Sequence, residues 1–365
     1  MNERIREVDL HLTNRCNLVC AHCSVDSGAG RSSWDEMPVE QWLQVIDEAA
    51  RLGCRYVDLT GGEPVLFGGV ERIVERVVQS GMHLELQSNG LLLTAERLRE
   101  LKRAGLATLV ISLDGPESQH DLMRGRAGVY RSAIRAIGEA VSSGFEVRVT
   151  RVFDHTSCSS DMDSFAADLD RIGVSHLSIN MFSPVTAKHF ARWQKPSAAS
   201  WMATVDLIER VASRVRFPIT YEVAYARPDE VAELFAEETR CLIERRRWFL
   251  IRCDGEVYPC YHFVHRAEMS LGSILRTPLS GLIGDEGGGW DAYADIGQLP
   301  SGCANCSFGS ACGGGCPSPG YLNLGSLAVK DVRCEVERGF IPVCPFVKRR
   351  AGSKSVTNIS PYYGS

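Results

Sequence analysis

The chain has 365 residues, of which 44% are hydrophobic and 23% are charged, and its formal net charge is −5. This composition is typical of a folded globular protein and excludes a mainly disordered chain. The mild negative charge offers no basic surface to displace counterions from a duplex, so we expect no nucleic-acid partner. The length corresponds to two domains, or to one large α/β domain with an addition.

The sequence contains 14 cysteines, which indicates either a disulfide framework or metal ligation. Residues 1–8 are charged and carry no secretory signal. No apolar run approaches the ~18 residues that would cross a bilayer, so we expect no membrane association. We therefore expect a cytoplasmic protein, in which clustered cysteines bind metal because disulfides do not persist there.

The chain from residue 8 to residue 181 alternates between strand-like and helix-like patterns. Apolar and polar residues alternate in six expected strands, at residues 8–13, 56–60, 83–87, 108–113, 146–152 and 176–181. Helical spacing of apolar residues predicts helices at residues 38–52, 70–79, 95–103, 130–142 and 161–172. This order predicts an α/β fold, a partial (β/α)6 TIM-like barrel with its chemistry at the carboxyl ends of the strands.

After about residue 217 this alternation stops. One acidic helix is expected at residues 228–238, and residues 248–260 predict a hairpin that turns at Asp254-Gly255. We expect the chain to divide into a barrel core (1–215), a bridging region (216–240), a small cysteine-rich domain (241–347) and a mobile tail (348–365).

Three cysteines, Cys16, Cys20 and Cys23, follow the first expected strand with the spacing C-x3-C-x2-C. Thiolates in one loop can converge on a metal site, and soft thiolates select iron–sulfur clusters or zinc. A cubane held by three cysteines has one iron without a protein ligand, and an open position is typical of catalytic metal sites. A zinc loop completed by His11 or His22 is the alternative from spacing alone.

The sequence Cys-Asn-Leu-Val-Cys-Ala-His-Cys at residues 16–23, placed after a first strand, resembles the cluster loop of the radical S-adenosylmethionine (SAM) superfamily. Further motifs of that superfamily follow the second, third and fourth expected strands, namely Gly61-Gly62-Glu63-Pro64, Ser88-Asn89-Gly90 and Ser112-Leu113-Asp114-Gly115. Each motif alone would be an ordinary turn. Their order at successive strand ends is specific to the superfamily.

The resemblance implies an enzyme in which Cys16, Cys20 and Cys23 hold a 4Fe–4S cluster that binds SAM. Such an enzyme cleaves SAM reductively to a 5′-deoxyadenosyl radical, which abstracts hydrogen from a substrate C–H bond. The resemblance also implies a set of SAM-binding residues, namely Gly61, Gly62, Glu63, Ser88, Asn89, Ser112, Asp114 and Arg124. Arg124 is a candidate partner for the SAM carboxylate or a member of a structural ion pair, and Arg151 is a weaker candidate for the first role.

The last third of the chain carries a second pattern, Cys241, Gly255-x4-Cys260, Cys303-x2-Cys306-x5-Cys312-x3-Cys316 and Cys334. It resembles the signature of the SPASM domain, which in that family holds two auxiliary 4Fe–4S clusters, so we expect three clusters in all. The resemblance assigns Cys303, Cys306, Cys312 and Cys334 to auxiliary cluster II. It assigns Cys241, Cys260 and Cys316 to auxiliary cluster I. A pair of zinc knuckles is the alternative.

Four cysteines remain, namely Cys54, Cys158, Cys253 and Cys344. We expect Cys54 to be a small buried residue. Cys253 lies in the same expected hairpin as Cys260, so cluster I is either closed by Cys253 or open to substrate. Cys344 competes with Cys334 as a ligand of cluster II, and the spacing favours Cys334.

Most SPASM relatives modify peptides, so the resemblance favours maturation of a ribosomally made peptide. A small-molecule natural product, such as a sugar or an aminocyclitol that is dehydrogenated, epimerised or decarboxylated, is the alternative substrate, and a tetrapyrrole is a third. An iron–sulfur redox sensor is the non-enzyme alternative, but a sensor has no need of the three strand-end motifs. We expect an electron donor such as flavodoxin or ferredoxin as a partner. Candidates to face the cavity are Asp9, His11, Tyr258 and His262.

Overall fold

The computed structural model describes residues 5–28, 34–153, 161–186, 189, 197–235, 241–284, 288–344, 346–353 and, for the backbone, 356–357. Cys158, residues 236–238 of the expected acidic helix and most of the expected tail lie outside the described residues. In the described ranges, no helix has the length and apolar character to span a bilayer.

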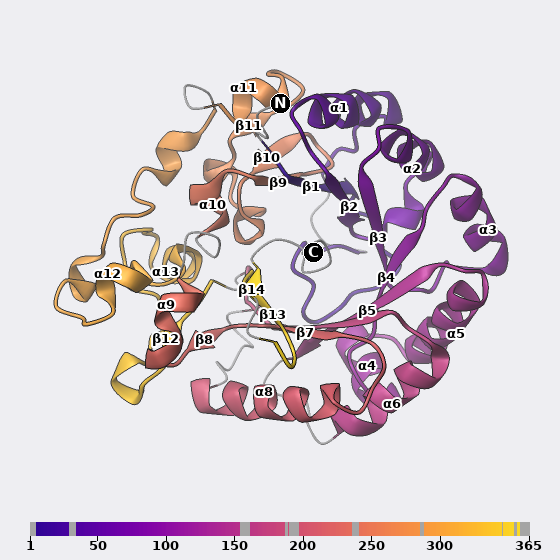
Figure 1. Ribbon diagram of the computed structural model, residues 1–365. Helices are drawn as coiled ribbons and strands as arrows, with labels where there is room; N and C mark the ends of the chain where they lie inside the picture. Colours follow the sequence, from indigo (N-terminus) through magenta and orange to yellow (C-terminus); the bar gives the residue numbers. More distant parts are fainter. Residues whose placement is uncertain are drawn as a thin grey trace.

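A curved sheet forms the centre of the molecule, and its strand order is β11-β10-β9-β1-β2-β3-β4-β5-β6-β7-β13-β14. These strands are β1 (Glu7–Thr13), β2 (Tyr56–Gly61), β3 (His83–Ser88), β4 (Thr108–Ser112), β5 (Glu146–Phe153), β6 (His176–Met181), β7 (Ile219–Glu222), β9 (Trp248–Ile251), β10 (Glu256–Tyr258), β11 (Gly272–Ser273), β13 (Lys348–Arg350) and β14 (Val356–Thr357). Strands β9 and β1 to β7 run parallel. The sheet curves into an open barrel (Figure 1).

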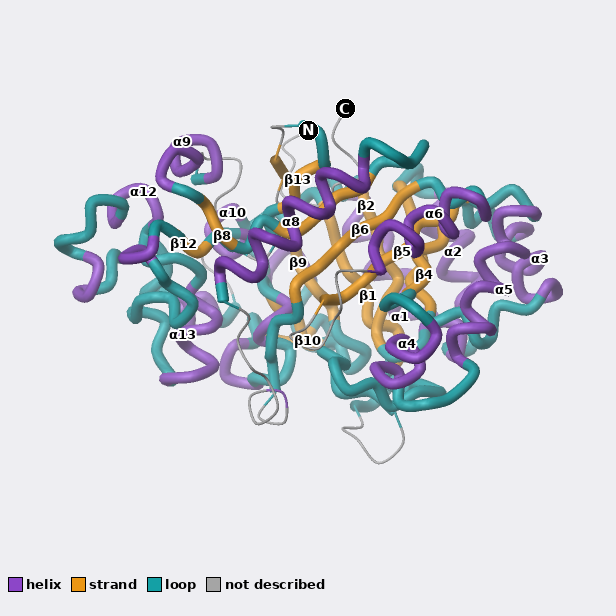
Figure 2. The backbone as a smooth tube through the Cα atoms, turned by 90° about the horizontal axis from the view of Figure 1, so that it is seen from below, coloured by secondary structure: helices purple, strands orange, loops and turns teal. Residues whose placement is uncertain are grey.

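Helices cover the outer side of this sheet (Figure 1). The longer helices are α1 (Val39–Arg51), α2 (Val70–Gln79), α3 (Ala95–Arg103), α4 (Glu117–Arg124), α5 (Val129–Ser142), α6 (Met162–Ile172) and α8 (Ala198–Ala212). Shorter helices follow, namely α9 (Val231–Leu234), α10 (Leu242–Arg245), α11 (Leu279–Leu282), α12 (Gly309–Cys312) and α13 (Pro317–Leu324). Two perpendicular views of the backbone place α9, α12 and α13 beside the barrel, near the two-stranded sheet of β8 (Tyr225–Ala226) and β12 (Ile341–Pro342) (Figures 1 and 2).

The α/β class and the partial barrel predicted from the sequence are confirmed. The six expected strands are present as β1 to β6, and their ends differ from the predicted ones by one residue at most. Helix α4 was not predicted, because its short polar sequence lacks an extended apolar stripe. The hairpin of β9 and β10 turns where Gly255 adopts a φ of +86°, and β9 joins the barrel sheet by pairing with β1.

The chain end contradicts one expectation. Residues 348–350, which were expected in a mobile tail, form β13 and pair antiparallel with β7, with Lys348 opposite Glu222. The physical reason is that β7 would otherwise present an edge of unpaired backbone groups. The barrel sheet also continues past residue 215, because β7 pairs with β6 in parallel. The division into domains otherwise stays a prediction.

The alternation along the strands separates an apolar outer face from an inner face that carries many polar side chains. In β2, Val57 and Leu59 are buried in the core that the outer helices share, whereas Asp58 and Thr60 line a cavity in the barrel lumen. This follows from the two-residue period of a strand, whose successive side chains point to opposite faces. The lumen is therefore a hollow space lined by both polar and apolar side chains instead of a packed apolar core.

Candidate active site

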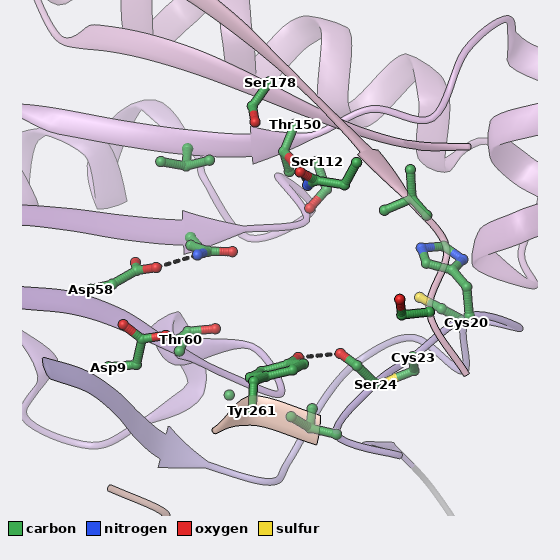
Figure 3. A pocket seen from close by; sticks show the side chains of 18 of the residues that line it. Asp9, Cys20, Cys23, Ser24, Asp58, Thr60, Ser112, Thr150, Ser178 and Tyr261 are labelled. Carbon is green, nitrogen blue, oxygen red and sulfur yellow. Dashed lines mark hydrogen bonds between the residues drawn. The ribbon is translucent and has the colours of Figure 1, made fainter. Parts of the chain in front are cut away.

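A cavity of about 440 Å³ extends from the carboxyl ends of the strands into the barrel lumen. Its volume falls in the range of small-molecule and cofactor sites. Figure 3 shows Ser112, Thr150 and Ser178 from three neighbouring strands on one wall, with Cys20 and Cys23 at the rim. The cavity thus joins the cysteine loop to the inner face of the sheet.

The three predicted cluster cysteines, Cys16, Cys20 and Cys23, all line this cavity. They pack together around Leu18 and Val129, in a small cluster separate from the main core. In the described part of the chain, no three His, Cys, Asp or Glu side chains are grouped to hold one metal ion. This arrangement fits an iron–sulfur cubane better than zinc, because a cubane takes one thiolate per iron and spreads its ligands apart.

Neither histidine of the zinc alternative completes a tetrahedral site with these thiols. His11 is 1% exposed and packs edge-on against Tyr261, with 5.9 Å between the ring centroids. His22 places its Nε2 atom 3.7 Å from the carboxylate of Asp114. The donor set that remains consists of three soft thiols, which suits iron–sulfur binding.

Gly61 and Gly62 bring the end of β2 against the cysteine loop. The backbone N–H of Gly62 donates to the carbonyl of Thr13 at 2.8 Å, and the N–H of Glu63 donates to the carbonyl of Arg15 at 2.9 Å. A Cβ atom on Gly62 would lie 2.2 Å from the Arg15 oxygen, and one on Gly61 would lie 2.5 Å from the Thr13 oxygen. Only glycine permits this close approach.

Glu63 connects the ends of two neighbouring strands. Its carboxylate accepts hydrogen bonds from the Ser88 hydroxyl at 3.0 Å and from the backbone N–H of Asn89 at 2.9 Å. Burial raises the pKa of Glu63 to about 7, although these two donors oppose the shift. Glu63 is 1% exposed and lies behind the cavity wall, whereas Ser88 and Asn89 line the cavity.

Arg124 joins the cysteine loop to the end of β4. Its Nε atom donates to Asp114 at 2.7 Å, and its Nη1 atom lies 3.9 Å from the sulfur of Cys20. Burial opposes ionisation of Asp114, but the positive charges of Arg124 and His22 outweigh it and lower the pKa to about 2. Arg124 and Ser112 line the cavity, and Asp114, which is fully buried, lies behind it.

Arg151 does not reach this site. Its side chain is fully buried, pairs with both carboxylate oxygens of Asp161 at 3.0 Å and lies over the rings of Phe153 and Phe165. The alternative that assigned it to the SAM carboxylate is therefore replaced by a structural ion pair under α6.

Several residues that line the cavity belong to none of the predicted motifs, namely Asp58, Gln87, Thr150, Ser178, Asn180, Glu222 and Lys348. Of the four residues expected to face the cavity, Asp9 and His262 line it, and His11 and Tyr258 do not. The signal that identifies the missed residues is their alternation with apolar residues along each strand.

The lumen holds a group of carboxylates. Asp9 accepts a hydrogen bond from the Trp248 indole at 3.1 Å, and Asp58 accepts one from Gln87 (Figure 3). Burial raises the pKa of both Asp9 and Asp58, and repulsion between neighbouring carboxylates adds to the effect. Arg148 neutralises Glu85 in the same group. Burial in the lumen therefore favours the protonated form of these carboxyl groups.

The cysteines of the last third form two groups. The first, here called the outer thiol group, consists of Cys303, Cys306, Cys312 and Cys334, the four predicted ligands of auxiliary cluster II. Burial, and then the charges of Cys334 and Cys306, raises the pKa of Cys303. Burial raises the pKa of Cys312 to about 11, and Cys334 and Cys303 contribute. These four thiols are thus close neighbours.

The second, here called the inner thiol group, contains Cys241, Cys260 and Cys316, the three predicted ligands of auxiliary cluster I. Burial, and then the charge of Cys316, raises the pKa of Cys241 to about 12. Burial, Cys316 and Cys241 together raise the pKa of Cys260. A fourth thiol, that of Cys344, shares a hydrogen bond with Cys316.

The structure does not bring Cys253 into the inner thiol group. In the β9–β10 hairpin, Tyr258 pairs with Leu250, so Cys260 lies beyond the open end while Cys253 lies at the turn. Measured along the hairpin, Cys253 and the position of Cys260 are about five residues apart, which corresponds to about 15 Å in extended chain. The carbonyl of Cys253 instead accepts a hydrogen bond from the N–H of Met37 at 2.8 Å.

Comparisons with known proteins agree with this geometry. The model of the radical SAM superfamily matches residues 10–157, and that of an iron–sulfur cluster-binding domain, SPASM, matches residues 241–307. The PqqA peptide cyclase of Rhodopseudomonas palustris is 27% identical over 89% of this chain and 85% of its own length. The AdoMet-dependent heme synthase of Nitratidesulfovibrio vulgaris is 24% identical over 88% of this chain and 90% of its own length.

A solved structure shares the fold. Streptococcus suis SuiB bound to its precursor peptide SuiA superimposes with a TM-score of 0.73 at 16% sequence identity, covering 91% of this chain and 76% of that one. The barrel and the cysteine-rich region are therefore arranged as in a known architecture.

Proposed function

Because the chain belongs to the radical SAM superfamily and carries a SPASM domain, we propose that it matures a ribosomally made peptide by radical chemistry at a C–H bond. The enzyme uses SAM and 4Fe–4S clusters, which together supply a 5′-deoxyadenosyl radical for hydrogen abstraction. The observation that supports a peptide as the substrate is the sequence similarity to a PqqA peptide cyclase, which extends over most of both chains.

The roles of the site residues are part of this proposal. Cys16, Cys20 and Cys23 hold the cluster that binds SAM, and they leave one iron without a protein ligand. The SAM-contacting residues are those that line the cavity at the strand ends, namely Gly61, Gly62, Ser88, Asn89, Ser112 and Arg124. Glu63 and Asp114 are positioning residues, since each lies behind the wall and orients residues that line it.

The lumen receives the part of the peptide that reacts. Its polar lining, which includes Asp9, Asp58, Asn180 and Glu222, suits one polar side chain of the peptide and keeps the rest of the peptide outside the barrel. A few placed polar groups of this kind fix the orientation of a bound molecule. Orientation and exclusion of water are what the protein contributes, since the cofactor carries the chemistry.

The auxiliary clusters are proposed to carry electrons between the substrate and an external donor. The outer thiol group holds auxiliary cluster II and the inner thiol group holds auxiliary cluster I. We further propose a flavodoxin or a ferredoxin as the donor. The cytoplasm is the proposed location, because reduced thiols persist there.

The test combines anaerobically reconstituted protein with SAM, dithionite and a short peptide encoded beside its gene. We expect 5′-deoxyadenosine, together with a peptide whose mass has changed by the loss of hydrogen. The control is the Cys16→Ala, Cys20→Ala, Cys23→Ala variant, which should form neither product. Formation of 5′-deoxyadenosine without any change in the peptide would exclude that peptide as the substrate.

A tetrapyrrole is the second candidate substrate, because the heme synthase matches this chain over nearly its full length. The same assay with a porphyrin in place of the peptide separates the two. Conversion of the porphyrin, with the peptide unchanged, would overturn the peptide proposal and leave the radical SAM assignment intact.

A further inference from the structure

The inner thiol group has a fourth member that the seven-cysteine signature does not include. Cys344 and Cys316 share a hydrogen bond, although they belong to distant parts of the sequence. A cavity of about 310 Å³ is lined by Cys241, Cys316 and Cys344, and also by Cys312 of the outer thiol group. Thiols from three separate segments therefore line one space, and Cys260 is a close neighbour of Cys241 and Cys316.

Hydrogen bonds hold the segments of Cys316 and Cys344 in register. One Asp331 oxygen, Oδ2, accepts from the backbone N–H of Cys316 at 3.0 Å and from the Arg333 guanidinium at 2.8 Å. The same guanidinium donates to the carbonyl of Val343 at 2.8 Å, directly before Cys344. Asp331 is fully buried and Arg333 is 3% exposed, so this link is shielded from water. A buried, paired charge of this kind specifies one arrangement of the backbone.

We propose that Cys344 is the fourth ligand of auxiliary cluster I, together with Cys241, Cys260 and Cys316. The proposal rests on the proposed function only in that the chain assembles this cluster. On ligation the Cys344 thiol loses its proton and its sulfur bonds to iron. All four irons then have a protein ligand, so the cluster transfers electrons and does not bind substrate.

The other candidate ligands are placed less well. Cys334 belongs to the outer thiol group, where it neighbours Cys303 and Cys312. Cys253 lies at the far end of the β9–β10 hairpin from Cys260, and the charged groups around its thiol are Asp254, Glu36 and Arg252. A carboxylate-flanked thiol at that position is remote from the cavity that Cys241 and Cys344 share.

The experiment uses the full chain in which Cys16, Cys20 and Cys23 are replaced by alanine, so that only the auxiliary clusters assemble. Iron content and the EPR spectrum of the reduced protein are measured after anaerobic reconstitution. The parent should hold about eight irons per chain, for two 4Fe–4S clusters. Cys344→Ala should lose at least one iron per chain or shift the spectrum of one cluster, and Cys253→Ala should match the parent.

A conservative variant keeps the test decisive if Cys344→Ala fails to fold. Cys344→Ser retains the size of the side chain and offers a harder oxygen ligand, so the EPR signal of one cluster should shift while circular dichroism stays unchanged. Adding imidazole to the parent should change neither signal, because no iron is open.

Three results would overturn the proposal. The first is loss of iron in Cys253→Ala while Cys344→Ala matches the parent. The second is a parent signal that responds to imidazole, which indicates an open iron. The third is a Cys316–Cys344 disulfide found by thiol counting in the reconstituted parent. None of these readouts depends on SAM cleavage or on a peptide, so failure of the proposed function leaves them unaffected.

Discussion

The carboxylate of Glu63 accepts a 2.9 Å hydrogen bond from the backbone N–H of Asn89, and this bond ties the end of β2 to the end of β3. Asn89 in turn donates its side-chain amide to Asn17 at 2.8 Å, within the cysteine loop. One buried acid therefore sets the relative position of two strand ends and the loop that carries the cluster ligands.

Two substitutions of Glu63 separate positioning from direct contact with SAM. Glu63→Ala leaves the N–H of Asn89 and the hydroxyl of Ser88 without their acceptor, so we expect a loss of about 2 kcal/mol in the free energy of unfolding. In Glu63→Gln the amide oxygen can still accept from the N–H of Asn89, and the amide NH2 can donate to the hydroxyl of Ser88 in place of the present bond. SAM affinity should therefore stay close to that of the parent protein. Urea denaturation and calorimetric titration with SAM measure the two effects. An affinity loss of about tenfold or more in Glu63→Gln, equivalent to 1.4 kcal/mol, would indicate direct contact.

Gly62→Ala should disrupt the contact between β2 and the cysteine loop. The added Cβ would lie 2.2 Å from the Arg15 carbonyl oxygen, which is backbone and cannot rotate away. We expect a loss of about 3 kcal/mol in stability, as for overpacking in a core, and loss of 5′-deoxyadenosine formation. The matched control is Gly68→Ala, whose Cβ would meet no atom within 4 Å. Equal activity of the two variants would contradict this reading of the loop.

Asp58→Asn tests the lumen as the substrate site. Its Oδ1 atom has no hydrogen-bond partner among the described residues, and the side chain faces the cavity. We expect formation of 5′-deoxyadenosine without peptide to persist, while modified peptide falls by about tenfold, as for loss of one hydrogen bond. Asp168→Asn, at an exposed ion pair with Arg171, is the control. A parallel fall in both products would place Asp58 at the SAM site instead.

His176 predicts a pH dependence of stability. Burial, and then the charge of Arg148, lowers the pKa of His176 to about 3 from its ordinary value of 6.5, while its Nε2 atom contacts the Thr220 hydroxyl at 2.9 Å. Below pH 6.5 the unfolded chain binds a proton that the folded chain does not, so stability decreases as the pH falls. Between pH 6.5 and 5.5 the parent should lose about 1 kcal/mol more than His176→Gln. Anaerobic urea denaturation at both pH values measures this difference, and equal slopes would contradict it.

The sequence was sufficient to predict the barrel and the residues at the rim of the cavity. The two-residue alternation in β1 to β6 predicts the strands, because one face of each packs on helices. The motifs at residues 61–63 and 88–90 lie at strand ends, and parallel strands bring their carboxyl ends to one edge. Local spacing also identifies Cys16, Cys20 and Cys23, since they share one loop.

What the sequence alone could not decide depends on contacts between distant segments. From the sequence, residues 348–350 resemble part of a polar tail. In the structure they form a strand, because the edge of β7 offers backbone groups for pairing. Cys253 is a neighbour of Cys260 along the chain, yet the hairpin register places them at opposite ends.

The local patterns of this chain thus determine an α/β barrel with a loop of cluster-binding cysteines. Strand alternation and cysteine spacing can be recognised in the sequence because each involves residues that are close together along the chain. The tertiary structure decides which cysteines of the last third share a site. Cys316 and Cys344 meet because the buried Asp331–Arg333 pair connects their backbones. A hydrogen-bonded link of this kind depends on which segments lie together in the folded protein, and the spacing of cysteines along the chain does not predict that.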